Sequence, residues 1–139
     1  MRKIKYFDSE LSIEEYIKIQ IVRNDGIRSL VYRQDLIDEC EKRNIKTKAT
    51  STKEQLVNLL VADGVTYKEL ANKYKIGVTS KVYQEAFGIE HKQVKKLEKK
   101  KIINVVGQYE FRAYGKNLTA PLYDTYQFAS IPEEVIKNI

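Results

Sequence analysis

The amino-acid sequence predicts a mainly α-helical protein that carries a small β hairpin near its C-terminus. Two observations support this fold class. From about residue 12 to residue 101, apolar side chains recur every three or four positions, which is the spacing of amphipathic helices. After Lys101 the period becomes that of a strand, because Tyr109, Phe111 and Ala113 alternate with charged residues. We therefore expect helices along most of the chain and a hairpin behind them.

Length and composition restrict the class of protein. The chain has 139 residues, 42% of them hydrophobic, which suits one domain or two very small ones with a packed core. Cys40 is the only cysteine, so no intrachain disulfide is possible and a reducing compartment is expected. The first residues do not read as a signal peptide, and no stretch approaches the roughly 20 apolar residues of a membrane span. We expect a cytoplasmic protein that does not enter a membrane.

Helix-start signals divide the first half of the chain. Ser12 and Glu15 have the spacing of a capping box, which predicts a first helix over about 13–22. A second helix is expected over about 29–43, followed by a polar, extended stretch at 45–51. The inward-facing residues of this second helix would be Leu30, Leu36, Ile37 and Cys40.

Four more helices are expected before the strand-like region, each opened by a recognisable signal. They are a helix opened by Thr52 and Gln55 and closed by Asp63-Gly64, a helix opened by Thr66 and Glu69, a helix over 81–87 capped by Ser80, and a lysine-rich helix over 90–101.

The C-terminal region has the composition of strands and turns. Residues 102–106 are mostly β-branched and residues 122–128 are rich in Tyr and Thr, so both are expected to be extended. A turn is predicted at Gly115-Lys116-Asn117. Pro132 would then begin a short helix, since Glu133 and Glu134 behind it suit the positive end of a helix dipole.

Positive charge is concentrated in the lysine-rich helix. Residues 91–101 hold six lysines and a single acid, Glu98, whereas the whole chain has a net charge of +6. At about 100° per residue, four of these lysines lie within roughly 60° of one direction, and Val94 and Leu97 point the opposite way. The four are Lys92, Lys95, Lys96 and Lys99. Such a ridge suits the phosphates of a nucleic acid, although it could also be an ordinary solvated face.

The segment from residue 79 to residue 128 resembles a winged helix-turn-helix of the MerR or excisionase-like kind. The resemblance depends on Gly88-Ile89, Val94, Leu97, Ile102-Ile103 and the hairpin behind them, while Gln84 replaces the usual small residue. It implies that a recognition helix meets the phosphates, that His91 and Gln93 at its start face the bases, and that a wing adds cations. The implied contact residues are His91, Lys92, Gln93, Lys95, Lys96, Lys99, Lys100, Arg112 and Lys116. Arg112 and Lys116 could equally be ordinary exposed charges on a hairpin.

A second resemblance covers residues 29–64. Leu36 to Ile45 and Lys53 to Leu60 look like the two helices of a SAP or helix-extended-helix module, a small hairpin found in DNA-associated and phage proteins. Ala49, Thr50 and Ser51 stand where that family usually has Gly. The resemblance implies DNA contacts from Lys46, Lys48 and Lys53, which would otherwise belong to a plain polar loop.

Catalysis has little support in the sequence. No phosphate-binding loop, dinucleotide turn or metal-ligand spacing is found, and the acid pairs fall in first helical turns where capping explains them. No cofactor or metal is expected. Among the tyrosines, Tyr109, Tyr114, Tyr123 and Tyr126 could stack on bases, but their strand spacing is more typical of sheet packing.

We therefore expect three parts: an N-terminal helix (1–28), a SAP-like hairpin (29–64) and a winged helix-turn-helix (65–139). The predicted function is non-catalytic binding of duplex DNA, in transcription regulation of a phage or mobile element. The alternative is an interaction protein, for example anti-CRISPR-like, whose basic surface meets a host protein or ribonucleoprotein. The sequence carries no sign of the oligomeric state.

Overall fold

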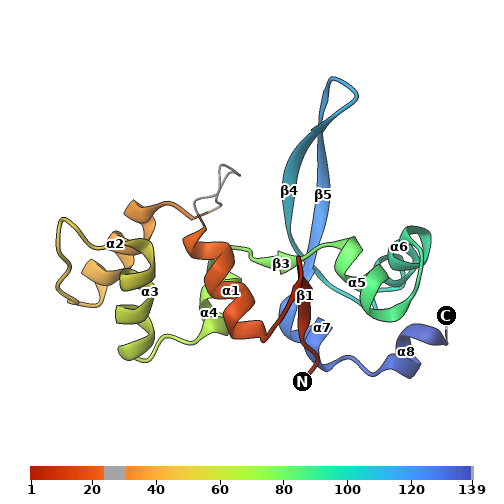
Figure 1. The fold of residues 1–139 in the computed structure, drawn as a ribbon, viewed down its shortest axis with the longest axis horizontal. Coiled ribbons are helices and arrows are strands. Elements are labelled where there is room, and N and C mark those ends of the chain that lie inside the picture. The colour runs from red at the N-terminus through yellow and green to blue at the C-terminus, as the bar shows by residue number, and fades with distance from the viewer. Residues whose placement is uncertain (24–30, 139) are drawn as a thin grey trace.

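The chain folds into a mixed α/β structure, about half helical, in a computed structural model that describes residues 1–23 and 31–138. Within these residues it forms eight helices, one two-stranded sheet and one three-stranded sheet (Figure 1). The predicted C-terminal hairpin is thus confirmed. The structure contains more strands than the sequence predicted, so the chain is mixed α/β and not mainly helical. The elements are β1 (Ile4–Tyr6), β2 (Ser9–Leu11), α1 (Ile13–Val22), α2 (Arg33–Lys42), α3 (Lys53–Ala62), α4 (Tyr67–Lys73), β3 (Gly77–Val78), α5 (Ser80–Phe87), α6 (His91–Lys99), β4 (Val105–Ala113), β5 (Lys116–Asp124), α7 (Thr125–Ser130) and α8 (Glu133–Lys137).

The N-terminus begins with a hairpin that the sequence did not predict. Its strands have only three residues each, too few for a clear alternation, and pair through Ile4 and Leu11, which are both buried. The predicted capping box after it is confirmed. The Glu15 amide donates to Ser12 Oγ at 3.2 Å, and the Ser12 amide donates to Glu15 Oε1 at 3.3 Å.

The two helices of the predicted SAP-like module, α2 and α3, form where expected, although α2 is shorter. It begins at Arg33 among the described residues, and the predicted inward position of Leu30 lies outside them. Leu36 and Cys40 are fully buried. Arg33 fastens the following loop, because its guanidinium donates to the carbonyl oxygens of Ser51 at 2.7 Å and Ala49 at 2.8 Å.

Five consecutive helices, α2 to α6, end in the same way. A residue at or directly after each C-cap has a left-handed backbone, with φ between +55° and +99°, and the next amide donates to a carbonyl five residues back. The residue that makes this bond is always Ile or Val and packs on the core, so it fixes the direction in which the chain leaves the helix. The left-handed residues are Asn44, Gly64, Lys75, Gly88 and Lys101, followed by Ile45, Val65, Ile76, Ile89 and Ile102.

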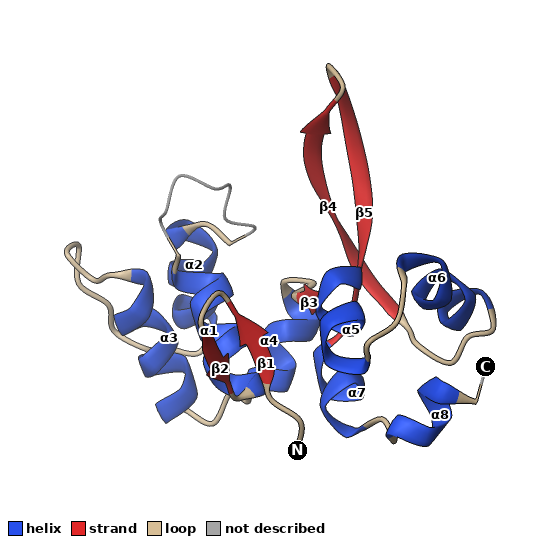
Figure 2. Cartoon of the chain, turned by 45° about the vertical axis from the view of Figure 1, so that its right-hand side comes forward, coloured by secondary structure: helices blue, strands red, loops and turns tan. Residues whose placement is uncertain are grey.

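The three-stranded sheet has the order β3-β5-β4. The two residues of β3 pair with Tyr123 and Asp124 of β5, so most of β4 and β5 are bonded only to each other. Figure 2 shows this hairpin standing clear of the helices. Gly77 is required in β3, because a Cβ there would lie 2.6 Å from the carbonyl oxygen of Tyr123. Its own carbonyl accepts a hydrogen bond from the Tyr16 hydroxyl at 2.8 Å, which joins α1 to the sheet.

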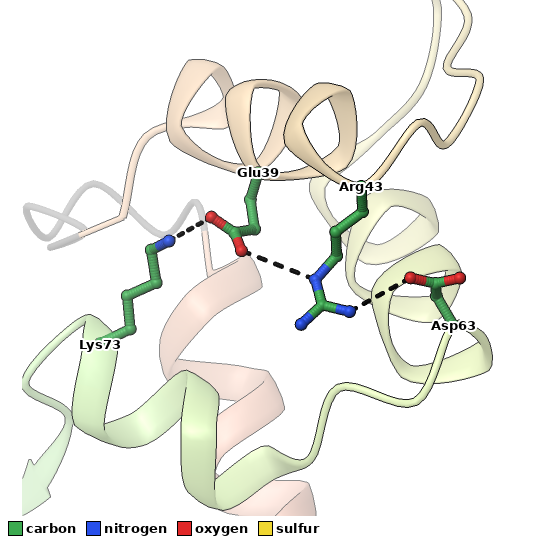
Figure 3. Close-up of polar contacts among 4 residues, drawn as sticks. All are labelled: Glu39, Arg43, Asp63 and Lys73. Atoms are coloured by element: carbon green, nitrogen blue, oxygen red, sulfur yellow. Dashed lines mark hydrogen bonds and ion pairs between the residues drawn. The ribbon is translucent and has the colours of Figure 1, made fainter.

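A chain of polar contacts joins α2 to α3 and α4 (Figure 3). Glu39 accepts a hydrogen bond from the Lys73 ammonium and lies 3.7 Å from the Arg43 guanidinium, which in turn donates to Asp63 at 3.2 Å. The hydrogen bond from Lys73 is the main reason that the pKa of Glu39 lies below its ordinary value. These contacts orient α2 across the ends of its neighbours.

Four predictions about element bounds are wrong. The stretch 102–104 is not a strand, and the turn of the hairpin is Tyr114-Gly115, with Lys116 and Asn117 already in β5. The predicted strand over 122–128 ends at Asp124, whose side chain accepts from the Gln127 amide at 3.0 Å and so caps α7. Ser80 is the first residue of α5, and Thr79 is its N-cap.

The buried residues of all these parts form one contiguous core, from Ile4 to Ile136. At its C-terminal end the ring of Tyr83 is surrounded by Phe87, Tyr123 and Phe128, with ring centroids 5.0 to 5.9 Å apart. The Arg2 guanidinium lies 4.5 Å from the Phe87 ring centroid, which anchors the N-terminus on this cluster. In the described part of the chain, no helix has the length and hydropathy needed to cross a membrane.

Candidate nucleic-acid interface

The candidate interface is built on α5, α6 and the tight turn between them. Gly88, with φ of +63°, ends α5, and nothing lies within 4 Å of where its Cβ would be. Ile89 then packs on the core, and α6 begins two residues later. Val94 and Leu97 are both 0% exposed, so they hold the inner side of α6 on the core as the sequence predicted.

The outer side of α6 is cationic. We call it the lysine face, and its residues Lys92, Lys95, Lys96, Lys99 and Lys100 are all exposed. Two of these ammonium groups have carboxylate partners in their own chain. Lys92 lies 3.5 Å from Glu90, and Lys95 lies 3.3 Å from Glu98. For the other three, no ion pair forms within residues 1–23 and 31–138.

The two ion pairs do not neutralise the lysine face. Lys92–Glu90 is fully solvent-exposed and Lys95–Glu98 is partly exposed, and ion pairs of this kind contribute at most about 1 kcal/mol each and weaken in salt. A phosphate that approaches Lys92 or Lys95 can replace the carboxylate without burying an unpaired charge. The face therefore keeps its positive potential, even though part of its charge is locally balanced.

His91, at the start of α6, is tied back to α5. Its Nδ1 lies 2.8 Å from Ser80 Oγ, which also accepts a hydrogen bond from Gln84 Nε2 at 3.0 Å. Since Gln84 supplies one proton to the Ser80 oxygen, the Ser80 hydroxyl proton can be donated to the imidazole. The ring is thus oriented, and its Nε2 makes no hydrogen bond to any described residue.

Gln93, which was expected to face the bases, instead caps the helix to which it belongs. Its Oε1 accepts a hydrogen bond from the Glu90 amide at 2.7 Å, so it caps the start of α6. A bidentate contact with adenine needs both the oxygen and the nitrogen of the amide. Gln93 would have to leave its capping position to make that contact, so His91 is better placed to meet a base.

One anchor of α6 was not predicted. The Tyr123 hydroxyl of β5 donates to Glu98 Oε1 at 2.6 Å. The single acid of the lysine-rich segment is therefore held against the hairpin. No local pattern could have revealed this contact, because the two residues are 25 positions apart and belong to elements of different type.

The predicted wing residues lie near the tip of the hairpin. Arg112 pairs in register with Asn117, and Lys116 pairs with Ala113, directly beside the turn. Both cations are exposed.

The predicted residues of the SAP-like loop lie elsewhere. Lys46 and Lys48 are exposed and Lys53 is half-buried, and burial lowers the pKa of Lys53. In Figure 1, α2 and α3 stand at one end of the long axis and α6 at the other. The structure does not bring these two sets of lysines together.

The remaining candidates are distributed between core and surface. Tyr123 is buried, Tyr109 and Tyr126 are half-buried, and Tyr114 is exposed. Cys40 is buried as predicted, and burial raises the pKa of its thiol. Among the residues that the structure describes, no three His, Cys, Asp or Glu side chains are grouped so that they could share a metal ion.

Comparisons with protein-family models, with curated proteins and with solved structures found no match to this chain.

Proposed function

We propose that the protein binds duplex DNA without catalysis and that the lysine face of α6 is its main contact surface. One observation carries the proposal: α6 buries Val94 and Leu97 completely while the four lysines on its other side and the C-cap Lys100 stay exposed. A helix seated on the core in this way holds the backbone positions of its lysines in a fixed arrangement, which a free lysine-rich segment does not.

The order of the elements supports the proposal. Two short helices joined by a tight turn, α5 and α6, are followed directly by the hairpin β4–β5. The strand before α5, β3, pairs with the second strand of that hairpin, so both ends of the helix pair are held by one sheet. This order of elements is similar to that of a winged helix-turn-helix, in which the second helix enters the major groove, and the similarity supports the proposal.

The chemistry of the face favours phosphate contacts over reading of bases. Lysine offers a mobile point charge and lacks the planar fork with which arginine recognises guanine. Binding would therefore depend mainly on release of counterions from the DNA backbone. Lys46, Lys48 and Lys53 are not part of the proposed surface. They belong to the α2–α3 loop and the start of α3, and Figure 1 shows α2 and α3 at the opposite end of the long axis from α6.

The test is a charge reversal on the lysine face, Lys95→Glu with Lys96→Glu, measured by fluorescence anisotropy with a duplex of mixed sequence. Both residues are exposed, so the fold should persist, and circular dichroism checks this. The matched control is Lys3→Glu with Lys5→Glu, which makes the same change of net charge at two exposed residues near the N-terminus. The proposal predicts loss of binding for the first pair and a small effect for the second. Equal weakening by both pairs would contradict it.

One observation favours the alternative, a protein that acts by binding another protein. Phe111 and Leu118 are cross-strand partners on one face of the hairpin, and both are exposed. Phe111 and Tyr109 also line an open cleft of about 920 Å³ against Tyr16 of α1. Capture of partners from nuclease-treated lysate separates the two functions. Binding of a protein that is lost with Phe111→Ser and kept with Lys95→Glu/Lys96→Glu would favour the protein-binding alternative.

A further inference from the structure

The tip of the hairpin β4–β5 holds a residue that the turn does not favour. Ala113 pairs with Lys116, so the turn contains only Tyr114 and Gly115, whose φ angles are +55° and +72°. A two-residue turn with both positions left-handed is of type I′, for which Asn-Gly and Gly-Gly are the preferred pairs. A bulky aromatic residue at the first position has to adopt a backbone conformation that costs about 1 kcal/mol or more.

Packing does not explain the tyrosine either. Its side chain is 97% exposed, and no hydrogen bond or ring contact joins it to any residue in the described part of the chain. In contrast, Phe111 and Leu118 lower in the hairpin pair across the strands and support each other. A residue that strains its turn and contacts nothing in its own chain points to an external partner.

The charges around Tyr114 indicate the chemistry of that partner. Arg112 and Lys116 are exposed on either side of the turn, and neither forms an ion pair with a described residue. The nearest acid on the hairpin is Glu110, one cross-strand pair below Phe111 and Leu118. Arg112 and Lys116 point to opposite faces of the hairpin, because Lys116 pairs with Ala113, the neighbour of Arg112. An exposed aromatic ring at the turn with a cation on each face beside it fits a nucleic acid, because the ring can stack on a base while the cations meet the flanking phosphates.

The hairpin is long enough to bring this ring to a duplex that α6 already contacts. From Gly107 to Ala113 its strands bond only to each other, and at about 3.3 Å per residue this free arm measures roughly 20 Å. One helical turn of DNA measures about 34 Å, so the adjacent groove lies about 17 Å from the one in which α6 would sit. Figures 1 and 2 both show the arm rising beyond the helices.

We propose that Tyr114 is a base-contacting residue, whose ring stacks on or wedges beside a base of the DNA that the lysine face binds, while Arg112 and Lys116 hold the phosphates next to it. This inference depends on the proposed function and adds a second, aromatic contact to it. Aromatic and apolar side chains that enter a groove in this way partly unstack a base step.

The experiment uses Tyr114→Asn and a duplex in which 2-aminopurine replaces adenine along one strand, so that unstacking or stacking by the protein changes the fluorescence. Asparagine suits the left-handed position better than tyrosine, so the variant should fold at least as stably while lacking the ring. Tyr114→Phe keeps the ring. Phe7→Asn is the matched control, since Phe7 is an aromatic residue 76% exposed at the turn of the other hairpin with φ of +53°, next to Asp8.

The expected result is that Tyr114→Asn binds DNA roughly 5- to 150-fold more weakly and loses the change in 2-aminopurine fluorescence, as base–aromatic stacking predicts. The salt dependence should stay as in the wild type, because the ring neutralises no phosphate. Tyr114→Phe and Phe7→Asn should both behave like the wild type. If the wild type binds DNA and Tyr114→Asn matches it in affinity and fluorescence, the proposed role of Tyr114 is wrong. The proposal that the lysine face binds DNA is then unaffected. If the wild type does not bind duplex DNA at low salt, both proposals fail.

Discussion

The Tyr123 hydroxyl donates a 2.6 Å hydrogen bond to Glu98, and this contact joins the back of the lysine-rich helix to the second strand of the hairpin. The same Glu98 oxygen also lies 3.3 Å from the Lys95 ammonium, so Glu98 links the hairpin to the lysine face. Because both residues belong to elements that the proposed interface uses, the bond holds α6 and the hairpin in one relative orientation.

Tyr123→Phe should therefore destabilise the protein. The variant keeps the buried ring and removes only the hydrogen bond to a charged acceptor, which typically contributes about 1.5–3 kcal/mol to the free energy of unfolding. Glu98 is half-buried, so we expect the lower part of this range. Urea unfolding measures the effect, and an unchanged midpoint would mean that the bond does not hold the two elements together.

Tyr83→Phe should stabilise the protein, in contrast to Tyr123→Phe. The Tyr83 hydroxyl is buried and makes no hydrogen bond to a described residue, so removing it also removes the cost of desolvating an unsatisfied group. The ring contacts with Phe87 and Phe128 remain. We expect the free energy of unfolding to rise by about 1 kcal/mol in the same urea experiment. A lower free energy of unfolding would indicate that the hydroxyl has a hydrogen-bond partner in solution.

Lys75→Gly should stabilise the end of α4. Lys75 has φ of +55°, a conformation that glycine adopts at no steric cost. The substitution should therefore raise the free energy of unfolding by up to about 1 kcal/mol. Gly88→Ala is the reverse substitution and serves as the control. Gly88 also has a left-handed backbone, with φ of +63°, and the new Cβ would meet no atom within 4 Å, so only the backbone strain changes. It should lose a similar amount. Thermal unfolding of both variants checks the pair, and equal shifts of the same sign would contradict the argument.

Stability should fall at alkaline pH. Burial is the main cause that raises the pKa of Tyr74 to about 12, and it raises the pKa of Tyr16, Tyr83 and Tyr123 as well. Above the ordinary tyrosine pKa of about 10, the unfolded chain loses these protons while the folded chain keeps them, so each rise in pH favours unfolding. Each tyrosine contributes at most about 1.4 kcal/mol per pH unit. Urea unfolding at about pH 8 and about pH 11 measures the difference, and equal stability would show that these hydroxyls titrate normally.

DNA binding should depend steeply on salt. If the lysine face neutralises about four or five phosphates, the logarithm of the affinity should fall against the logarithm of the salt concentration with a slope near −4. Anisotropy titrations over a series of salt concentrations give this slope, and Lys99→Gln should make it about 1 unit shallower. A slope near zero would exclude phosphate contacts as the basis of binding.

Much of the helical part could be predicted because its signals are local. Ser12 with Glu15 and Thr52 with Gln55 mark helix starts through bonds that span three residues. Helix α6 could be divided into a buried and a cationic side because one helical turn determines which residues share a face. The order of residues 91–101 was therefore enough to predict the lysine face.

The strands could not be predicted as well, since they depend on partners far along the chain. β3 has only two residues and exists because Tyr123 and Asp124 of β5 lie beside it. The Tyr- and Thr-rich stretch after Asp124 has strand composition, yet it forms α7, because Asp124 caps it and Phe128 finds a place in the aromatic core. Tertiary packing outweighed local propensity at both positions.

The sequence by itself determined where the positive charge gathers and which side of α6 would be buried, because both follow from residue order within a few turns of helix. Only the tertiary structure decided that α2 and α3, with Lys46, Lys48 and Lys53 in and beside their loop, lie far from α6 (Figure 1). It also decided that Tyr123 bonds Glu98 and that Tyr114 is exposed at the tip of the hairpin. The physical reason is that distance in space, burial and hydrogen-bond partners depend on how the whole chain packs, and no local period encodes them.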